Sequence, residues 1–174
     1  MAVLKVLRYG DPALRRRAAP VGEVTPEVRA TIADMTETMY DEVGIGLAAP
    51  QVGISLRLIV VADEDGRGVQ ALLNPAIVDR GGEATGEEGC LSIPGVFAPV
   101  TRSAWVKIEA QDVNGGPLAI RATGLRARVL QHEIDHLDGV LFIDRVDPVT
   151  RDRIKRKIKK EGLREDASRH AFAL

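Results

Sequence analysis

The stretch VLQHEIDHLDGV, residues 129–140, places two of the chain's three histidines four residues apart. Residues at this spacing lie on one face of an α-helix, so the side chains of His132 and His136 can point at a single ion. Glu133 directly follows the first histidine, which completes the H-E-x-x-H arrangement, in which two imidazoles bind a divalent metal and the glutamate handles protons. The spacing and the glutamate together favour a metal site over two ordinary helical histidines.

The sequence around this motif predicts a helix over residues 124–138. Leu125 and Val129 recur on the face that carries the two histidines. Gly139 can end the helix, because glycine readily adopts the left-handed conformation that follows many helices. The two histidines are therefore expected side by side on a regular element.

A third ligand is needed, because catalytic metal sites of this kind normally have three protein ligands and a position for water. The remaining histidine, His170, lies in a charged C-terminal tail, where a ligand is not expected. The better candidate is Cys90, the only cysteine, within GEEGCLSIPG at residues 86–95. A cysteine alone is more often a small buried hydrophobic residue. Beside two histidines that lack a third ligand, its soft thiolate is suited to zinc or iron.

The glycine-rich stretch VGIGLAAPQVGI, residues 43–54, carries one polar side chain, Gln51, amid small apolar residues. On its own such a stretch is typical of a loop that leads from a helix into a strand. A buried side-chain amide needs a partner or a task, so Gln51 is a candidate for the functional site.

The other elements are predicted from periodicity and from turn residues. A first helix is expected over residues 25–43, where Thr25 can cap it and Pro26 suits the first helical position. Further predicted elements are strands at 56–61 and 71–75, a hairpin at 105–122 and a helix at about 148–162. Strands mixed with a few helices favour an α+β fold: a mostly antiparallel sheet around the central metal-binding helix, with an N-terminal and a C-terminal helix.

Length and composition indicate one globular domain over residues 1–174. Hydrophobic residues make up 45% of the chain and charged residues 28%, and the formal net charge of −1 gives no overall attraction to nucleic acid. A single cysteine excludes an internal disulfide, the first residues lack a secretory signal, and no apolar run approaches the length of a membrane span. We therefore expect a cytoplasmic protein with no membrane contact, whose mature sequence begins near residue 1.

Three segments taken together resemble the peptide deformylases, the enzymes that remove the formyl group from the N-terminal formyl-methionine of new bacterial proteins. The family's motifs G-φ-G-φ-A-A-x-Q, E-G-C-φ-S and Q-H-E-x-D-H, where φ is apolar, stand here at residues 44–51, 88–92 and 131–136. The opening VLRYGDPALRRRAAPV also looks like the family's start, so the resemblance covers nearly the whole chain. Three motifs in the right order are far more specific than H-E-x-x-H alone.

The resemblance implies chemical roles for the candidate residues. The implied metal ligands are Cys90, His132 and His136. Glu133 would act as acid and base, and Gln51 with the backbone N–H of Leu91 would donate to the developing oxyanion. The family's usual ion is Fe(II), with zinc, nickel or cobalt able to occupy the site.

The resemblance also implies how an N-formyl-methionine nascent peptide would bind. Backbone groups at Gly46 and Gly89 would pair with the extended substrate. The residues that match the lining of the family's methionine pocket are Ile45, Val129 and His132. Glu88 stands as a charge in an otherwise apolar segment, with Arg102 as its expected salt-bridge partner; a solvated surface pair is the alternative.

Two other functions compete with this interpretation. A zinc endopeptidase could use H-E-x-x-H, although the cysteine ligand and the lack of a downstream ligand motif oppose it. A binding module that has lost catalysis would be expected to lack Glu133 or a ligand, and neither is missing.

The basic segment RDRIKRKIKK, residues 151–160, holds seven basic residues and one acidic residue. Ile154 and Ile158 are four residues apart and can form a narrow apolar stripe on a helix. A solvated helix that packs by these isoleucines is one interpretation. The other is contact with RNA phosphates, since the family resemblance implies that a C-terminal helix docks on the ribosome.

Overall fold

The structure, a computed structural model, describes residues 2–164 of the 174-residue chain. Its helices are α1 (Pro26–Asp41), α2 (Gly124–Leu137) and α3 (Pro148–Glu161), with short 3₁₀ helices η1 (Pro12–Arg15), η2 (Ala49–Val52) and η3 (Phe142–Asp144). Its strands are β1 (Gly46–Ala48), β2 (Leu58–Ala62), β3 (Val69–Gly81), β4 (Ala84–Cys90), β5 (Ile93–Arg102), β6 (Trp105–Gln111) and β7 (Pro117–Thr123). The paired strands all run antiparallel within these residues. The predicted α+β fold is confirmed.

The three predicted helices form close to their predicted bounds, and in α1 and α3 the predicted capping residues make their hydrogen bonds. At the start of α1 the side chain of Thr25 accepts a hydrogen bond from the amide of Val28 at 3.2 Å. At the start of α3 the side chain of Asp147 accepts from the amide of Thr150 at 2.9 Å. The first helix ends two residues before its predicted end, because Val43 turns the chain into the left-handed region with a φ of 56°.

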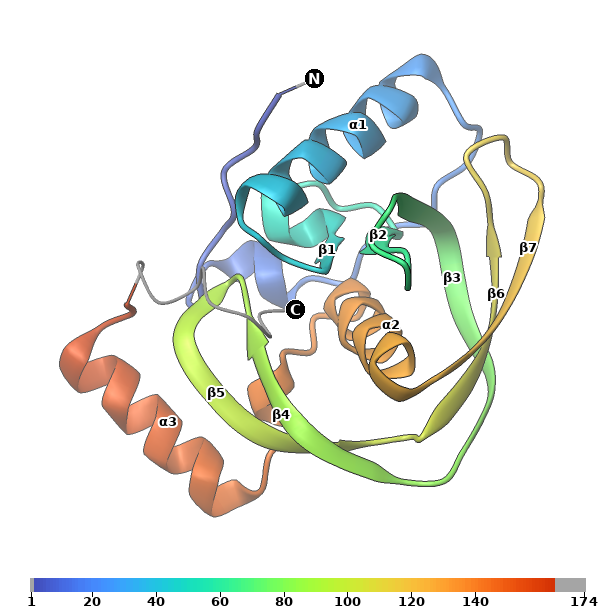
Figure 1. Cartoon of the computed structure of the whole chain (residues 1–174). Helices are drawn as coiled ribbons and strands as arrows, with labels where there is room; N and C mark the ends of the chain where they lie inside the picture. The colour runs from blue at the N-terminus through green and yellow to red at the C-terminus, as the bar shows by residue number, and fades with distance from the viewer. Residues whose placement is uncertain (1, 165–174) are drawn as a thin grey trace.

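A five-stranded sheet in the order β1-β2-β3-β6-β7 carries a helix on each face. Along β2 the side chains alternate between two core clusters: Ile59 and Val61 pack on the α2 side, and Leu58 and Val60 pack on the α1 side. Figure 1 shows α2 near the centre of the molecule, with the strands curving around it. The helix that carries the paired histidines is therefore the central, most enclosed element.

A second sheet, made of β4 and β5, was not predicted from the sequence. These strands carry glycines, glutamates and two prolines, Pro94 and Pro99, which are unfavourable strand residues, so no alternating apolar pattern marks them. The pair covers a third core cluster together with η3, and Ile154 and Ile158 of α3 pack against that cluster. The sheet is thus in two parts rather than one.

The stretch at 43–54 also differs from a plain loop. It forms the three-residue strand β1 and the 3₁₀ helix η2, and β1 is the edge strand of the larger sheet. No helix within residues 2–164 has the length and apolar character that crossing a membrane requires. The single domain predicted over all 174 residues stays a prediction, and His170 lies outside the described residues.

Candidate metal centre

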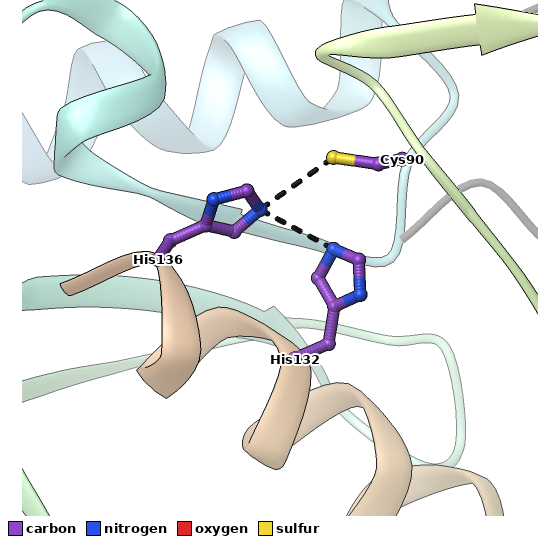
Figure 2. Close-up of side chains that lie close together, drawn as sticks. All are labelled: Cys90, His132 and His136. Carbon is purple, nitrogen blue, oxygen red and sulfur yellow. Dashed lines mark hydrogen bonds between the residues drawn. The ribbon is translucent and has the colours of Figure 1, made fainter. Parts of the chain in front are cut away.

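Three side chains converge from two elements: Cys90 from the end of β4, and His132 and His136 from the C-terminal half of α2 (Figure 2). The Sγ atom of Cys90 lies 3.5 Å from Nε2 of His136, and the two histidine Nε2 atoms lie 3.3 Å apart. One ligand atom from each residue falls within 4.8 Å of the other two, and all three side chains are buried. The residues predicted as ligands are brought together in space.

The chemistry of these three residues fits a single divalent ion. Burial lowers the pKa of His132 and holds that of His136 well below its usual value, which keeps both imidazoles neutral, the form that binds metals. Burial also raises the pKa of the Cys90 thiol to about 12, so a nearby cation is needed to make it a thiolate. One sulfur and two imidazole nitrogens form a three-ligand set suited to zinc or iron.

Glu133 lies against this group in full burial. Its Oε1 atom is 4.0 Å from Nε2 of His136, and neither carboxylate oxygen has a hydrogen-bond partner among residues 2–164. Burial, reinforced by the charge of Glu88, raises the pKa of Glu133 well above its usual value. A buried carboxyl group without a partner beside a group of metal ligands is a candidate for proton transfer.

The side-chain amide of Gln51 is buried, and both its oxygen and its nitrogen have hydrogen-bond partners. Its Oε1 accepts a hydrogen bond from the amide of Ala48 at 2.9 Å, which fixes the orientation of the side chain. Its Nε2 donates to Oγ of Ser92 at 3.1 Å and lies 3.6 Å from Sγ of Cys90. The donor end of the amide therefore faces the ligand group.

The N-terminal segment supports the same region, which the sequence indicated only through the resemblance of its opening residues. Leu91 directly follows Cys90, and its carbonyl accepts a hydrogen bond from Arg8 at 2.7 Å. The amide of Tyr9 donates to the carbonyl of Ser92 at 2.8 Å. The turn that carries Leu91 is thus held by the start of the chain.

A largely apolar cavity of about 420 Å³ includes two of the three residues expected to line a methionine pocket. Ile45 and Val129 line it, together with Leu125, whereas the ring of His132 faces the ligand group. Gly46 and Gly89 lie on β1 and β4, which are both edge strands, so each has an edge without a strand partner among the described residues. An extended peptide could pair with such edges.

Glu88 is buried, not a solvated surface residue, and its predicted partner is confirmed. Nε of Arg102 donates to one carboxylate oxygen at 2.6 Å and Nη2 to the other at 2.9 Å. Burial raises the pKa of Glu88, but the hydrogen bonds from His132 and Arg102 outweigh it and lower the value to about 2. Nδ1 of His132 lies 3.0 Å from Glu88, which leaves Nε2 turned towards Cys90 and His136.

The sequence did not predict a role for Arg128, whose Nη1 also donates a hydrogen bond to Glu88.

Comparisons with known proteins agree with this geometry. The model of the polypeptide deformylase family matches residues 3–152. A peptide deformylase of Alkalilimnicola ehrlichii is 51% identical over 162 residues, which are 92% of this chain and 91% of that protein. The crystal structure of a peptide deformylase from Legionella pneumophila is 45% identical and superposes with a TM-score of 0.86 over 91% of this chain and 95% of that one. The Ehrlichia chaffeensis peptide deformylase in complex with actinonin is 37% identical, with a TM-score of 0.85 over 92% and 99% of the two chains.

Proposed function

The chain belongs to the polypeptide deformylase family, and we propose from this premise how its own residues share the reaction. That reaction is the metal-dependent removal of the formyl group from the N-terminal formyl-methionine of newly synthesised proteins, with release of formate. One observation carries the assignment of roles: the carboxylate of Glu133 is buried, has no hydrogen-bond partner among residues 2–164, and lies beside the group of Cys90, His132 and His136.

The ligands of the ion are Sγ of Cys90 and the Nε2 atoms of His132 and His136. Their burial and mutual distances support this assignment. A divalent ion held there would lower the pKa of water towards neutrality and act as a Lewis acid. We propose Fe(II) as the physiological ion, since iron suits a mixed thiolate and imidazole site; zinc, nickel and cobalt can compete for the same ligands.

Glu133 is the acid and base. Its carboxylate accepts a proton from the attacking water and later gives a proton to the amine nitrogen that leaves. Burial raises its pKa, which favours the protonated form relative to a solvated carboxylate and so helps the group hold the proton between the two steps. The absence of other hydrogen-bond partners within residues 2–164 leaves both oxygens available for water and substrate.

Gln51 and the backbone N–H of Leu91 stabilise the negative charge that develops on the formyl oxygen. Gln51 is held by Ala48 with its Nε2 turned to the site, and Leu91 directly follows the Cys90 ligand. Donors fixed before the reaction starts need little reorganisation, and the loss of one typically costs about 3–4 kcal/mol of transition-state stabilisation.

The substrate lies extended between the edges of β1 and β4. Backbone groups at Gly46 and Gly89 pair with it, and its methionine side chain enters the cavity lined by Ile45 and Val129. The His132 side chain borders this pocket on the side that faces the metal ligands. Only a small acyl group fits where Gln51, Leu91 and the ligands converge, so formyl is preferred over acetyl.

We place the enzyme in the cytoplasm, at the ribosome. Its substrate is the nascent chain, and α3 presents the basic segment 151–160 with most of its charged side chains exposed. No membrane contact is proposed. The basic helix could meet RNA phosphates near the site where the nascent chain emerges.

Replacement of Glu133 by glutamine tests the assignment of roles. Glutamine keeps the shape of the side chain but not its basicity, so Glu133→Gln protein should bind one equivalent of metal and lose about a hundredfold or more of kcat on formyl-methionine peptides. Glu23→Gln, at an exposed position, serves as the matched control and should behave like the wild type. Near-normal turnover by metal-loaded Glu133→Gln protein would refute the role.

A further inference from the structure

Arg128 is a buried arginine on α2 that no motif singled out. Its side chain is 11% exposed, and it makes three hydrogen bonds. Nη1 donates to Oε2 of Glu88 at 2.6 Å and to the carbonyl of Val100 at 2.9 Å, and Nη2 donates to the carbonyl of Ala84 at 2.8 Å. The guanidinium is therefore fixed between the central helix and both strands of the smaller sheet.

Its contact with Glu88 leads directly to the ligand group. Oε2 of Glu88 receives both Nη1 of Arg128 and Nε of Arg102, while Oε1 faces Nδ1 of His132 at 3.0 Å. The two guanidinium groups come from different elements, α2 and β5, and restrain the same oxygen. A carboxylate clamped in this way can turn only if both arginines move, so the orientation of the His132 ring is restrained as well.

Arg128 is the arginine of this cluster that pairs with Glu88 alone. Arg102 is shared between Glu88 and Asp135, to which its Nη1 donates at 2.9 Å. Asp135 has a second partner in Arg145, whose Nε and Nη2 donate to it at 3.1 and 3.0 Å. Glu88 is fully buried, and its second guanidinium comes from Arg128; a buried charge is costly unless it is paired.

The neighbouring backbone leaves just enough space for this arginine. A Cβ atom built on Gly86 would lie 3.3 Å from both Cζ and Nε of Arg128. Such contacts are tighter than ordinary van der Waals distances, so a side chain at position 86 would press on the guanidinium. Glycine at 86 and arginine at 128 therefore form a matched pair across β4 and α2.

We infer that Arg128 is a positioning residue for the metal centre: it holds the Glu88 carboxylate so that His132 presents Nε2 to the ion. This inference rests on the proposed function, because it takes His132 as a ligand. Partners that orient a ligating histidine typically contribute about 10–100-fold to metal affinity.

Metal affinity in purified protein tests this role without an activity assay. Zinc dissociation constants are measured by competition with a chelator, and the cobalt–thiolate charge-transfer band reports ligation by Cys90. Arg128→Met should weaken zinc binding by about 10–100-fold, while Arg128→Lys, which keeps the positive charge, should recover part of that loss. Gly86→Ala should weaken binding less, because it only displaces the guanidinium.

Arg126→Met is the matched control. Arg126 lies on the same helix and carries the same charge, but it bonds to Gln70 at 2.6 Å instead of Glu88. Its zinc affinity should equal that of the wild type. If Arg128→Met lowers the melting temperature of the metal-free protein yet leaves zinc affinity unchanged, Arg128 is only structural and the inference is wrong.

Two further outcomes remain decisive. If Arg128→Met does not fold, Arg128→Lys decides the matter, and wild-type zinc affinity in that variant overturns the inference. A wild-type protein without a cobalt–thiolate band, or with one that survives in Cys90→Ser protein, overturns the proposed ligand set instead. The two failures are therefore distinguishable.

Discussion

At Gly46 the backbone of β1 leaves no room for a side chain. A Cβ atom there would lie 2.5 Å from Oε2 of Glu133 and 2.9 Å from its Cγ. The resemblance to known deformylases assigned Gly46 a contact with the substrate backbone. The structure adds a second reason for glycine at this position: a side chain would occupy the space of the Glu133 carboxylate, the proposed acid and base.

Gly46→Ala should therefore impair catalysis without loss of the metal. The added methyl group displaces the Glu133 carboxylate, and a misplacement of about 1 Å can cost about a hundredfold in rate. Kinetics of formyl-peptide hydrolysis, with metal content measured on the same sample, check this expectation. Gly22→Ala, where no atom lies within 4 Å of the new Cβ, is the control. Wild-type kcat/KM in Gly46→Ala protein would show that Glu133 is not held by this contact.

Metal binding should also depend on pH with a known sign. The pKa of Cys90 is raised to about 12, so the thiol must release a proton when the ion binds, whereas the imidazoles, whose pKa values are lowered, are already neutral near pH 7. Zinc affinity should rise about tenfold per pH unit between about pH 7 and about pH 9. The measurement is made in Glu133→Gln protein, so that no proton released by the Glu133 carboxyl group contributes to the pH dependence. An affinity that does not change with pH would argue against a thiolate ligand.

Most of the site was predictable at the level of single residues because its chemistry follows sequence spacing. His132, Glu133 and His136 share one helical turn, and Cys90 was reached as the best available third ligand. The contact between Gly86 and Arg128 joins residues far apart in the chain, and no spacing rule connects them. The burial of Glu88, as opposed to a surface position, likewise depended on the packing of α2 against β4 and β5.

Among the elements, the helices were predictable and the smaller sheet was not. Thr25 and Asp147 give explicit capping signals, and the apolar period of the helices is regular. The strands β4 and β5 instead contain glycines and glutamates whose burial is decided by tertiary contacts, which local preference does not report. The edge strand β1 has only three residues, too few for a period to be visible.

The end of α2 gives a prediction at this scale. Gly139 has a φ of 74°, and a Cβ atom there would lie 2.5 Å from the carbonyl oxygen of Arg15. Gly139→Ala should lower the free energy of unfolding by about 2 kcal/mol or more, since the left-handed conformation costs about 1 kcal/mol and the backbone contact adds to it. Urea unfolding of the metal-free protein measures the loss.

Gly53→Ala separates the two contributions. Gly53 is in the left-handed region, with φ 81° and ψ 12°, and the nearest atom to an added Cβ is Cδ1 of Leu7 at an ordinary 3.8 Å, so its replacement should cost only about 1 kcal/mol. Equal losses for the two variants would show that the contact between Gly139 and the segment of Arg15 does not strain the chain.

In the whole molecule, three segments far apart in sequence meet around α2: the β1–η2 stretch, the end of β4 and the histidine-bearing turn. The basic helix α3 packs on the third core cluster and presents its lysines to solvent. Catalysis and the proposed docking are therefore carried by different surfaces, and they can be separated by mutation.

Replacement of Lys155, Arg156, Lys159 and Lys160 by alanine should weaken ribosome binding at low salt and leave hydrolysis of a short formyl peptide unchanged. Alanine preserves the helix, and the loss of phosphate contacts reduces a salt-dependent affinity. Cosedimentation with ribosomes over a series of salt concentrations measures the effect. The matched control removes four exposed charges elsewhere: Arg16, Arg67, Arg80 and Lys107. Identical cosedimentation of both variants and the wild type would mean that α3 is only a solvated surface.

The most direct test of the central claim is formate release from two peptides that differ only in the N-terminal acyl group. Enzyme loaded with Fe(II) without oxygen should release formate from a formyl-methionine peptide, in equal amount to new free amino termini, and should act very little on the acetyl-methionine peptide. The Glu133→Gln protein, assayed in parallel, should release almost none. Cleavage of internal peptide bonds, or no formate from the metal-loaded wild type, would contradict the account.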